Sequence, residues 1–204
     1  MVARMMNHVQ SLDARVLFAF APLPVEVAAI DNHRRLIVTT SDGNDKYSIT
    51  QGTTRIYVTD EFGNAQASFQ NKKIRKIVVH LKDGNDFLKL NTQVPVLARG
   101  DYGNDTLFGA GENDDLFGDD GNDLMYGGGG DDLLDGGNGR DVLFAGGGID
   151  SLYGGIGSDR LFSRDEADPV GDVVNGGKGF AIDRLFVDAD DVVTRNRNDV
   201  VYRV

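Results

Sequence analysis

Several residue types that define common classes of protein are missing or scarce in this 204-residue chain. It contains no cysteine and no tryptophan, and it has only four prolines and three histidines. Without cysteine the chain can form neither disulfides nor thiolate metal sites. No stretch reaches the roughly 18 consecutive apolar residues that a membrane-spanning helix needs.

The charge balance and the motif content exclude further classes. The chain contains 32 acidic residues and 21 lysines and arginines, which gives a net charge of −11. The phosphates of a nucleic acid would repel such a chain. It contains no H-E-x-x-H zinc motif, no G-x-S-x-G elbow and no phosphate-binding P-loop. We therefore expect no catalytic residue, no organic cofactor, no nucleic-acid partner and no enzymatic activity.

Glycine and aspartate are abundant, and they follow a strict period. Seven nine-residue units run without a gap from Gly100 to Phe162: GDYGNDTLF, GAGENDDLF, GDDGNDLMY, GGGGDDLLD, GGNGRDVLF, AGGGIDSLY and GGIGSDRLF. The eighth position of every unit is Leu or Met. The sixth position is always aspartate: Asp105, Asp114, Asp123, Asp132, Asp141, Asp150 and Asp159. A flexible acidic linker has no reason to keep a large apolar residue at every ninth position.

The spacing of these units predicts a coiled architecture. Glycines supply tight turns, and the three residues after each aspartate form a minimal strand. Two units then make one coil of 18 residues, and successive coils stack about 4.8 Å apart. Aspartates of units n and n+2 should lie one above the other, which gives five vertical pairs: Asp105–Asp123, Asp114–Asp132, Asp123–Asp141, Asp132–Asp150 and Asp141–Asp159.

Stacked carboxylates repel one another unless a cation lies between them. Carboxylates and backbone carbonyls, with no thiol or imidazole nearby, are ligands for a hard cation. Calcium is the expected ion, with about five sites. Magnesium is the weaker candidate, because it demands a tighter octahedron and retains its waters.

The units resemble the RTX (haemolysin-type) calcium-binding nonapeptide, G-G-x-G-x-D-x-U-x, in which U is a large apolar residue. The resemblance implies an all-β fold, a right-handed parallel β-roll or β-helix solenoid. It also implies that two aspartates and turn carbonyls from both coils hold each ion. The turn glycines at the fourth position are Gly103, Gly121, Gly130, Gly139, Gly148 and Gly157. Glu112 replaces this glycine in the second unit and Ala145 replaces the first glycine of the sixth, so the Asp114–Asp132 pair is the least regular.

The array concentrates the negative charge of the chain. Residues 100–162 hold 14 acidic residues against Arg140 and Arg160, a local charge of −12, whereas the rest of the chain sums to +1. One apolar side chain per nine residues makes a thin core, while ordering so many glycines costs much conformational entropy. We therefore expect the array to fold only when metal binds.

The flanking segments predict an N-terminal cap and irregular C-terminal rungs. Residues 1–24 are expected to be a disordered tail or an export leader, because Ser11–Phe18 resembles the LEPR-x-LL leader of large exported bacterial surface proteins. Residues 25–99 are expected to form capping strands, and residues 163–204 irregular rungs and a cap. Expected strands are Arg35–Thr40, Lys46–Thr50, Arg55–Thr59, Gln66–Phe69 and Ile74–Leu81, with a hairpin turn at residues 61–64. Degenerate repeats at 41–47 and 82–88 and the C-terminal rungs add four possible ligands: Asp45, Asp86, Asp172 and Asp183.

Position nine is aromatic in six of the seven units. Phe108, Tyr126, Phe144 and Phe162 should form a ladder on one side of the coil. It could bind an extracellular glycan or a second copy of the chain, or simply stack between coils. Together, these features predict a secreted or cell-surface calcium-binding protein with a structural or adhesive role. The alternative is a polysaccharide-directed or enzyme-associated repeat module, like those of alginate-modifying enzymes.

Overall fold

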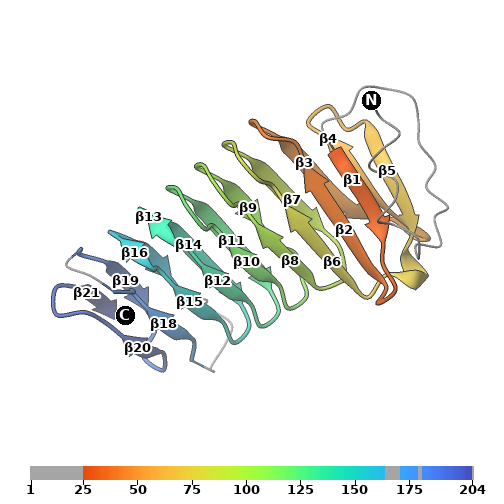
Figure 1. Ribbon diagram of the computed structural model, residues 1–204. Coiled ribbons are helices and arrows are strands. Elements are labelled where there is room, and N and C mark those ends of the chain that lie inside the picture. The colour runs from red at the N-terminus through yellow and green to blue at the C-terminus, as the bar shows by residue number, and fades with distance from the viewer. Residues whose placement is uncertain (1–24, 164–170, 179–180, 204) are drawn as a thin grey trace.

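The computed structural model describes residues 25–163, 171–178 and 181–203. The predicted tail or leader at residues 1–24 lies outside these described residues. The described chain is a long solenoid of stacked strands, and its only helix is the short 3₁₀ turn η2 (Asn71–Lys73) (Figure 1). No helix in these described ranges is long and apolar enough to cross a membrane.

Two sheets form the opposite walls of the solenoid. The first sheet has the order β1 (Val25–Ile30), β2 (Arg35–Thr40), β6 (Lys76–His80), β8 (Val96–Arg99), β10 (Asp115–Phe117), β12 (Leu133–Asp135), β15 (Ser151–Tyr153), β18 (Val173–Asn175) and β20 (Val192–Thr194). The second has the order β21 (Val200–Arg203), β19 (Arg184–Val187), β17 (Arg160–Phe162), β14 (Val142–Gly147), β11 (Leu124–Gly129), β9 (Thr106–Phe108), β7 (Phe87–Asn91), β3 (Lys46–Gln51), β4 (Arg55–Asp60) and β5 (Ala65–Gln70). A small pair, β13 (Asn138–Gly139) and β16 (Ile156–Gly157), lies in the turns.

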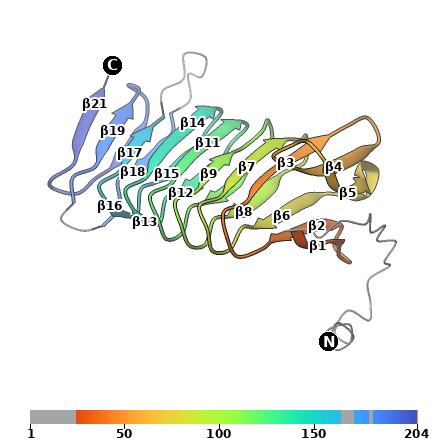
Figure 2. The ribbon, with the colours of Figure 1, turned by 90° about the horizontal axis from the view of Figure 1, so that it is seen from above.

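The predicted 18-residue coil is confirmed by the strand registers. Leu116 of β10 pairs with Leu134 of β12, and Leu107 of β9 pairs with Met125 of β11, always in parallel. The chain therefore alternates between the two sheets and returns to the same sheet one layer further on, as the view from above shows (Figure 2). The predicted class, an all-β parallel solenoid, is correct.

The N-terminal end is closed by antiparallel strands. β3, β4 and β5 form an antiparallel meander, and β1 pairs antiparallel with β2. The predicted turn at residues 61–64 joins β4 to β5, where Gly63 has a φ of 78°. All five predicted strands of this segment are present, whereas β1, β7 and β8 are strands that the sequence patterns do not predict. At this end of the solenoid, β1 and β5 are therefore the edge strands of the two sheets.

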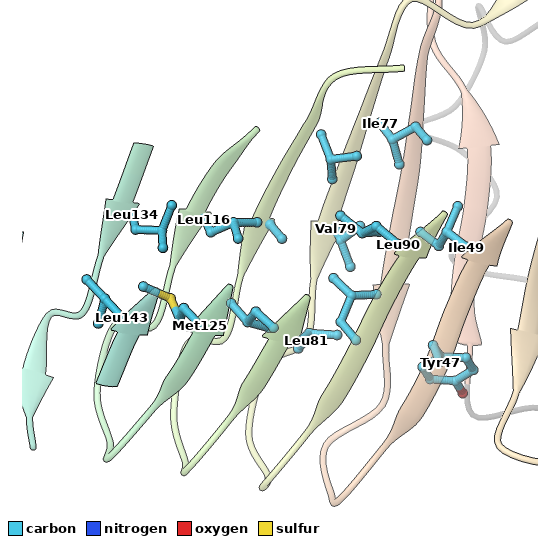
Figure 3. Close-up of a cluster of buried hydrophobic side chains, with 14 of the residues drawn as sticks. Tyr47, Ile49, Ile77, Val79, Leu81, Leu90, Leu116, Met125, Leu134 and Leu143 are labelled. Carbon is cyan, nitrogen blue, oxygen red and sulfur yellow. The ribbon is translucent and has the colours of Figure 1, made fainter. Parts of the chain in front are cut away.

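The hydrophobic core is thin in the array and wider at the N-terminal end. Each nine-residue unit of the array contributes its eighth-position side chain, such as Leu116, Met125 or Leu134, and each of these is fully buried. The longer N-terminal strands contribute two, such as Tyr47 and Ile49 of β3 (Figure 3). Each fully buried Leu or Met contributes about 1.5–3 kcal/mol. The N-terminal coils therefore bury more apolar surface per coil than the repeats do.

The coils continue past the array with altered lengths. β17 pairs with β19 in the register Leu161 to Leu185, and β15 pairs with β18 in the register Leu152 to Val174. Strands β18 and β19 therefore extend the two sheets beyond the array. Both sheets run through the N-terminal strands, the array and the C-terminal rungs, so the three segments share one continuous core.

Candidate metal centre: two rows of buried aspartates

The regular nine-residue spacing of the repeat places every sixth-position aspartate side chain in the interior of the solenoid. Residues two apart on a strand face the same side of a sheet, so the aspartate follows the inward direction of the buried eighth-position residue. The seven array aspartates are 0–3% exposed. The sequence predicts that these residues lie in register, and the structure stacks them at the two edges where the chain passes from one sheet to the other.

Backbone hydrogen bonds link the aspartates at the first edge into what we call the long row. The N–H of each aspartate donates to Oδ1 of the aspartate one coil further on, at 2.7 Å from Asp105 to Asp123 and 2.9 Å from Asp123 to Asp141. The same bond recurs outside the array at both ends. The long row comprises Asp45, Asp86, Asp105, Asp123, Asp141, Asp159, Asp183 and Asp199.

The second edge carries a similar but shorter set, the short row. It comprises Asp114, Asp132, Asp150, Asp172 and Asp191. It begins at Asp114, because the residue in register one coil earlier is Val96, whose N–H donates to Asp114 Oδ1 at 2.8 Å. Val96 belongs to the apolar core of the N-terminal coils. The two edges are therefore unequal, although the repeat sequence treats them alike.

The second carboxylate oxygen distinguishes the interior members of the rows. Among the described residues, the aspartates whose buried Oδ2 no hydrogen-bond donor reaches include these six: Asp86, Asp105, Asp123, Asp132, Asp141 and Asp159. A buried oxygen left without a donor costs about 1–3 kcal/mol, and more when it is charged. Six such oxygens at equivalent positions fit a common ligand that supplies positive charge.

Within the array, a glycine beside each of these oxygens keeps the space around it open. A Cβ added to Gly136 would lie 2.5 Å from Asp141 Oδ2 and 2.7 Å from the carbonyl oxygen of Gly154, one coil further on. Gly118 and Gly154 stand in the same relation to Asp123 and Asp159. A side chain at these positions would displace the carboxylate. The first glycine of the repeat thus brings a carboxylate oxygen and a carbonyl oxygen together around the same space.

The fourth-position glycines predicted to supply carbonyls stack in the turns. Gly103, Gly121 and Gly139 have φ values of 131°, 157° and 146°. A Cβ on any of them would collide with the carbonyl of the equivalent glycine in the preceding coil. Gly130, Gly148 and Gly157 stack in the same way against neighbouring turns, and Gly130 meets the backbone of Glu112, which replaces glycine in its unit. Their role as ligands remains a prediction.

Burial makes the ionised form of these carboxylates costly. Desolvation, together with the charges of neighbouring aspartates, raises the pKa of Asp123 and Asp141 to about 7 and that of Asp132 to about 8. The pKa values of Asp105 and Asp159 rise to about 6 for the same reasons. Without a bound cation, the rows therefore favour protonated carboxyl groups at mildly acidic pH.

The structure places the possible ligands of the flanking segments in the same rows. Asp45, Asp86 and Asp183 join the long row and Asp172 joins the short row. Asp191 and Asp199 also join the rows, although they are not among the ligands that the sequence predicts. Each is followed by an apolar residue two positions later, and this D-x-U pattern without the glycine turn is the signal that identifies them.

The predicted aromatic ladder is present and longer than the repeats imply. Phe108, Tyr126, Phe144, Phe162, Phe186 and Tyr202 stack with centroid distances of 4.5–4.7 Å and interplanar angles of 3–10°. Phe87 precedes them at 5.6 Å with a tilt of 50°. These distances match the spacing of adjacent strands. The ring faces therefore cover one another, and the ladder presents mainly ring edges to its surroundings.

Taken together, the fold and the rows define a class: a parallel β-solenoid whose edges carry stacked, buried carboxylates suited to a divalent cation. The model of one family, the RTX calcium-binding nonapeptide repeat (4 copies), matches residues 99–134 and 135–168. These residues belong to the RTX repeat family, and the whole architecture is that of an RTX β-roll. Searches of curated proteins and of solved structures gave no match.

The matched repeats indicate a calcium-binding β-roll, and the oxygen ligands that the rows offer agree with this. Within the described ranges, no three His, Cys, Asp or Glu side chains converge on one point. A cation in the rows would therefore take carboxylate oxygens from aspartates and complete its shell with backbone carbonyls, which suits calcium. When bound, calcium would compensate the negative charge of the aspartates that hold it.

Proposed function

We propose that this chain is an exported calcium-binding β-roll protein that folds when it meets extracellular calcium and has a structural or adhesive role at or outside the cell surface. The observation that carries the proposal is the set of six buried carboxylate oxygens without a hydrogen-bond donor. Array aspartates, together with carbonyls of the turn glycines, would hold about five ions.

The chemistry of the rows supports a link between calcium and folding. The buried carboxylates repel one another and are costly to desolvate, so a divalent cation that binds only the folded chain stabilises it. Extracellular calcium modules bind with dissociation constants of roughly 10⁻⁴–10⁻³ M. Such affinities would leave the chain unfolded where calcium is scarce and folded outside the cell. Secretion is usual for RTX repeat proteins, and the lack of cysteine is compatible with it.

A calcium titration of the full-length chain tests this proposal. Far-UV circular dichroism, recorded in chelator and then at rising calcium, should show a cooperative gain of β structure, and calorimetry should count about five or more ions per chain. Magnesium at the same concentrations is the matched control and should produce a much smaller change. Full β structure in chelator, or equal responses to both ions, would contradict the proposal.

The ladder bears on the alternative, a polysaccharide-directed or enzyme-associated module. Sugar rings bind aromatic side chains through the flat ring face, and along this ladder each inner ring is stacked on its neighbours. This arrangement favours a structural role, in which the rings hold successive coils together. The RTX β-roll is also typically structural rather than catalytic, so we propose no enzymatic activity. Retention of the protein on an extracellular polysaccharide, lost on replacing Phe144 by Ala, would reverse this assignment.

A further inference from the structure

The long row reaches beyond the residues that match the repeat family. Asp86 lies 13 residues before the matched segment begins at residue 99. It is 2% exposed, and its Oδ1 accepts the N–H of Asp45 at 2.7 Å. Its Oδ2 is buried without a hydrogen-bond donor, as in the repeat aspartates. Asp86 therefore shares the row hydrogen bond and the donor-free Oδ2 of the repeat aspartates, although Leu81 and Lys82 replace the first two glycines of its unit.

Asp45, one coil earlier, is built differently. Its Oδ2 accepts two hydrogen bonds from Ser41, at 3.1 Å from the backbone N–H and 3.0 Å from Oγ. The next strand beyond β3 is the antiparallel β4, so the parallel stack of coils ends at Asp45. Protein donors thus satisfy the oxygen that remains unsatisfied in Asp86.

The two ends of the short row are satisfied in the same way. Asp114 Oδ2 accepts the N–H of Ala110 at 2.9 Å. Asp191 Oδ2 accepts the hydroxyl of Ser163 at 2.6 Å and the N–H of Asp188 at 2.7 Å. Both ends of the short row, like Asp45 in the long row, therefore carry donors supplied by the chain itself.

The fourth end, Asp199 at the C-terminal side of the long row, also carries a chain donor, because its Oδ2 accepts the N–H of Asn196 at 2.6 Å. Oδ2 of Asp183 and Oδ2 of Asp199 would lie 2.6 Å and 2.8 Å from a Cβ added to Gly176, so both carboxylates face the same space. The two residues are 1% and 4% exposed. Two carboxylates buried side by side need a proton or a cation between them.

We infer that the calcium row extends beyond the matched repeats, to Asp86 at one end and to Asp183 at the other, and that Ser41, Ala110, Ser163 and Asn196 close the four row ends in place of an ion. The inference rests on the proposed function and specifies where the row of calcium sites begins and ends. Hydrogen-bond donors at a row end supply the partial positive charge that a cation supplies inside the row. The bound ions would then clamp the degenerate coils as well as the regular ones.

Calcium counts on full-length variants test these boundaries. Asp86→Asn and Asp183→Asn should each lose about one ion per chain relative to the unmodified protein. Asp45→Asn should keep the full count, as should the exposed controls Asp42→Asn and Asp190→Asn, which remove the same charge. Asparagine retains the oxygen that accepts the backbone N–H, so the coil itself should be preserved.

The outcomes separate this inference from the proposed function. If the unmodified chain binds no calcium, the proposed function fails. If it binds calcium but Asp86→Asn and Asp183→Asn keep the full count, or Asp45→Asn loses an ion, the boundaries assigned here are wrong. If Asp86→Asn loses its β-sheet signal in calcium, the N-terminal boundary is decided by Asp45→Asn alone. That variant must then bind as many calcium ions as the unmodified protein.

Discussion

Replacing Asp123 by Asn should have opposite effects with and without calcium. Asp123 lies in the middle of the long row, 2% exposed, with Oδ1 accepting the N–H of Asp105 and Oδ2 without a donor. Asparagine keeps an oxygen for the backbone bond but cannot ionise. The substitution therefore removes a buried charge and little else, which makes it a clean probe of the row.

The size of the effect follows from the pKa of Asp123, which burial raises from 3.8 to about 7. The folded chain then holds the proton more tightly than the unfolded chain, so stability is greatest below about pH 4 and falls as the pH rises through 7. At about 1.4 kcal/mol per pH unit, the ionised carboxylate costs about 4 kcal/mol at pH 8. In chelator, Asp123→Asn should be more stable than the unmodified chain by up to that amount at pH 8, and the difference should vanish near pH 4.

The assay is a pH titration of the far-UV circular dichroism from pH 4 to pH 8.5, once in chelator and once in excess calcium. In chelator, the pH at which the variant loses its β structure should be higher than that of the unmodified chain. In calcium the order should reverse, because the variant lacks a charged ligand. A variant that is less stable in chelator at pH 8, or a difference that does not depend on pH, would refute the idea that the row is destabilised by its own charge.

Two further substitutions test the turns and the ladder. Gly139→Ala should lower the free energy of unfolding in calcium by about 2–4 kcal/mol, because φ is 146° and the new methyl group meets the carbonyl of Gly121. The control Gly111→Ala, with nothing near its Cβ, should cost less than about 1 kcal/mol. Equal melting temperatures for the two variants would contradict the stacked turn. Phe144→Ala removes the ring stacks with Tyr126 and Phe162 and should lower the free energy of unfolding by about 1–3 kcal/mol. In the control Phe62→Ala, the replaced side chain is 81% exposed at the hairpin tip, so stability should change little. Thermal unfolding of both variants in calcium decides whether the ladder stabilises the coils.

The regular part of the fold could be predicted from sequence because the repeat encodes its own geometry. An aspartate at position six and a Leu or Met at position eight share one face of a strand, so the period alone fixes which side chains are buried and which residues stack. Leu107 pairs with Met125, and Asp105 donates to Asp123, as the 18-residue coil requires. The same argument places the ladder of Phe108 and its equivalents on the outer face.

The irregular parts could not be predicted, because other interactions replace the repeat there. Asp191 and Asp199 lack the glycine turn, yet they keep the row because their strands pair in register with β18 and β19. The short row stops at Asp114 because Val96 belongs to the wider apolar core of the capping coils. The inequality of the two edges thus depends on which coil lies next in space, and a local sequence window does not contain that information.

The partners of the carboxylate oxygens were equally beyond sequence reasoning. Asp45 and Asp86 both lie in a D-G-N-D segment, but only Asp45 has Ser41 within hydrogen-bond reach. Ser163 reaches Asp191 across 28 residues of chain. Such contacts depend on side-chain direction in neighbouring coils. They decide where a carboxylate needs a cation and where it does not.

The most direct measurement is a crystal structure of the full-length chain grown in calcium, with anomalous difference density used to locate the ions. We predict strong peaks between consecutive coils beside the Oδ2 atoms of Asp105, Asp123 and Asp141, each completed by turn carbonyls. Density for water alone at these positions, with the carboxylates placed as they are here, would contradict the account.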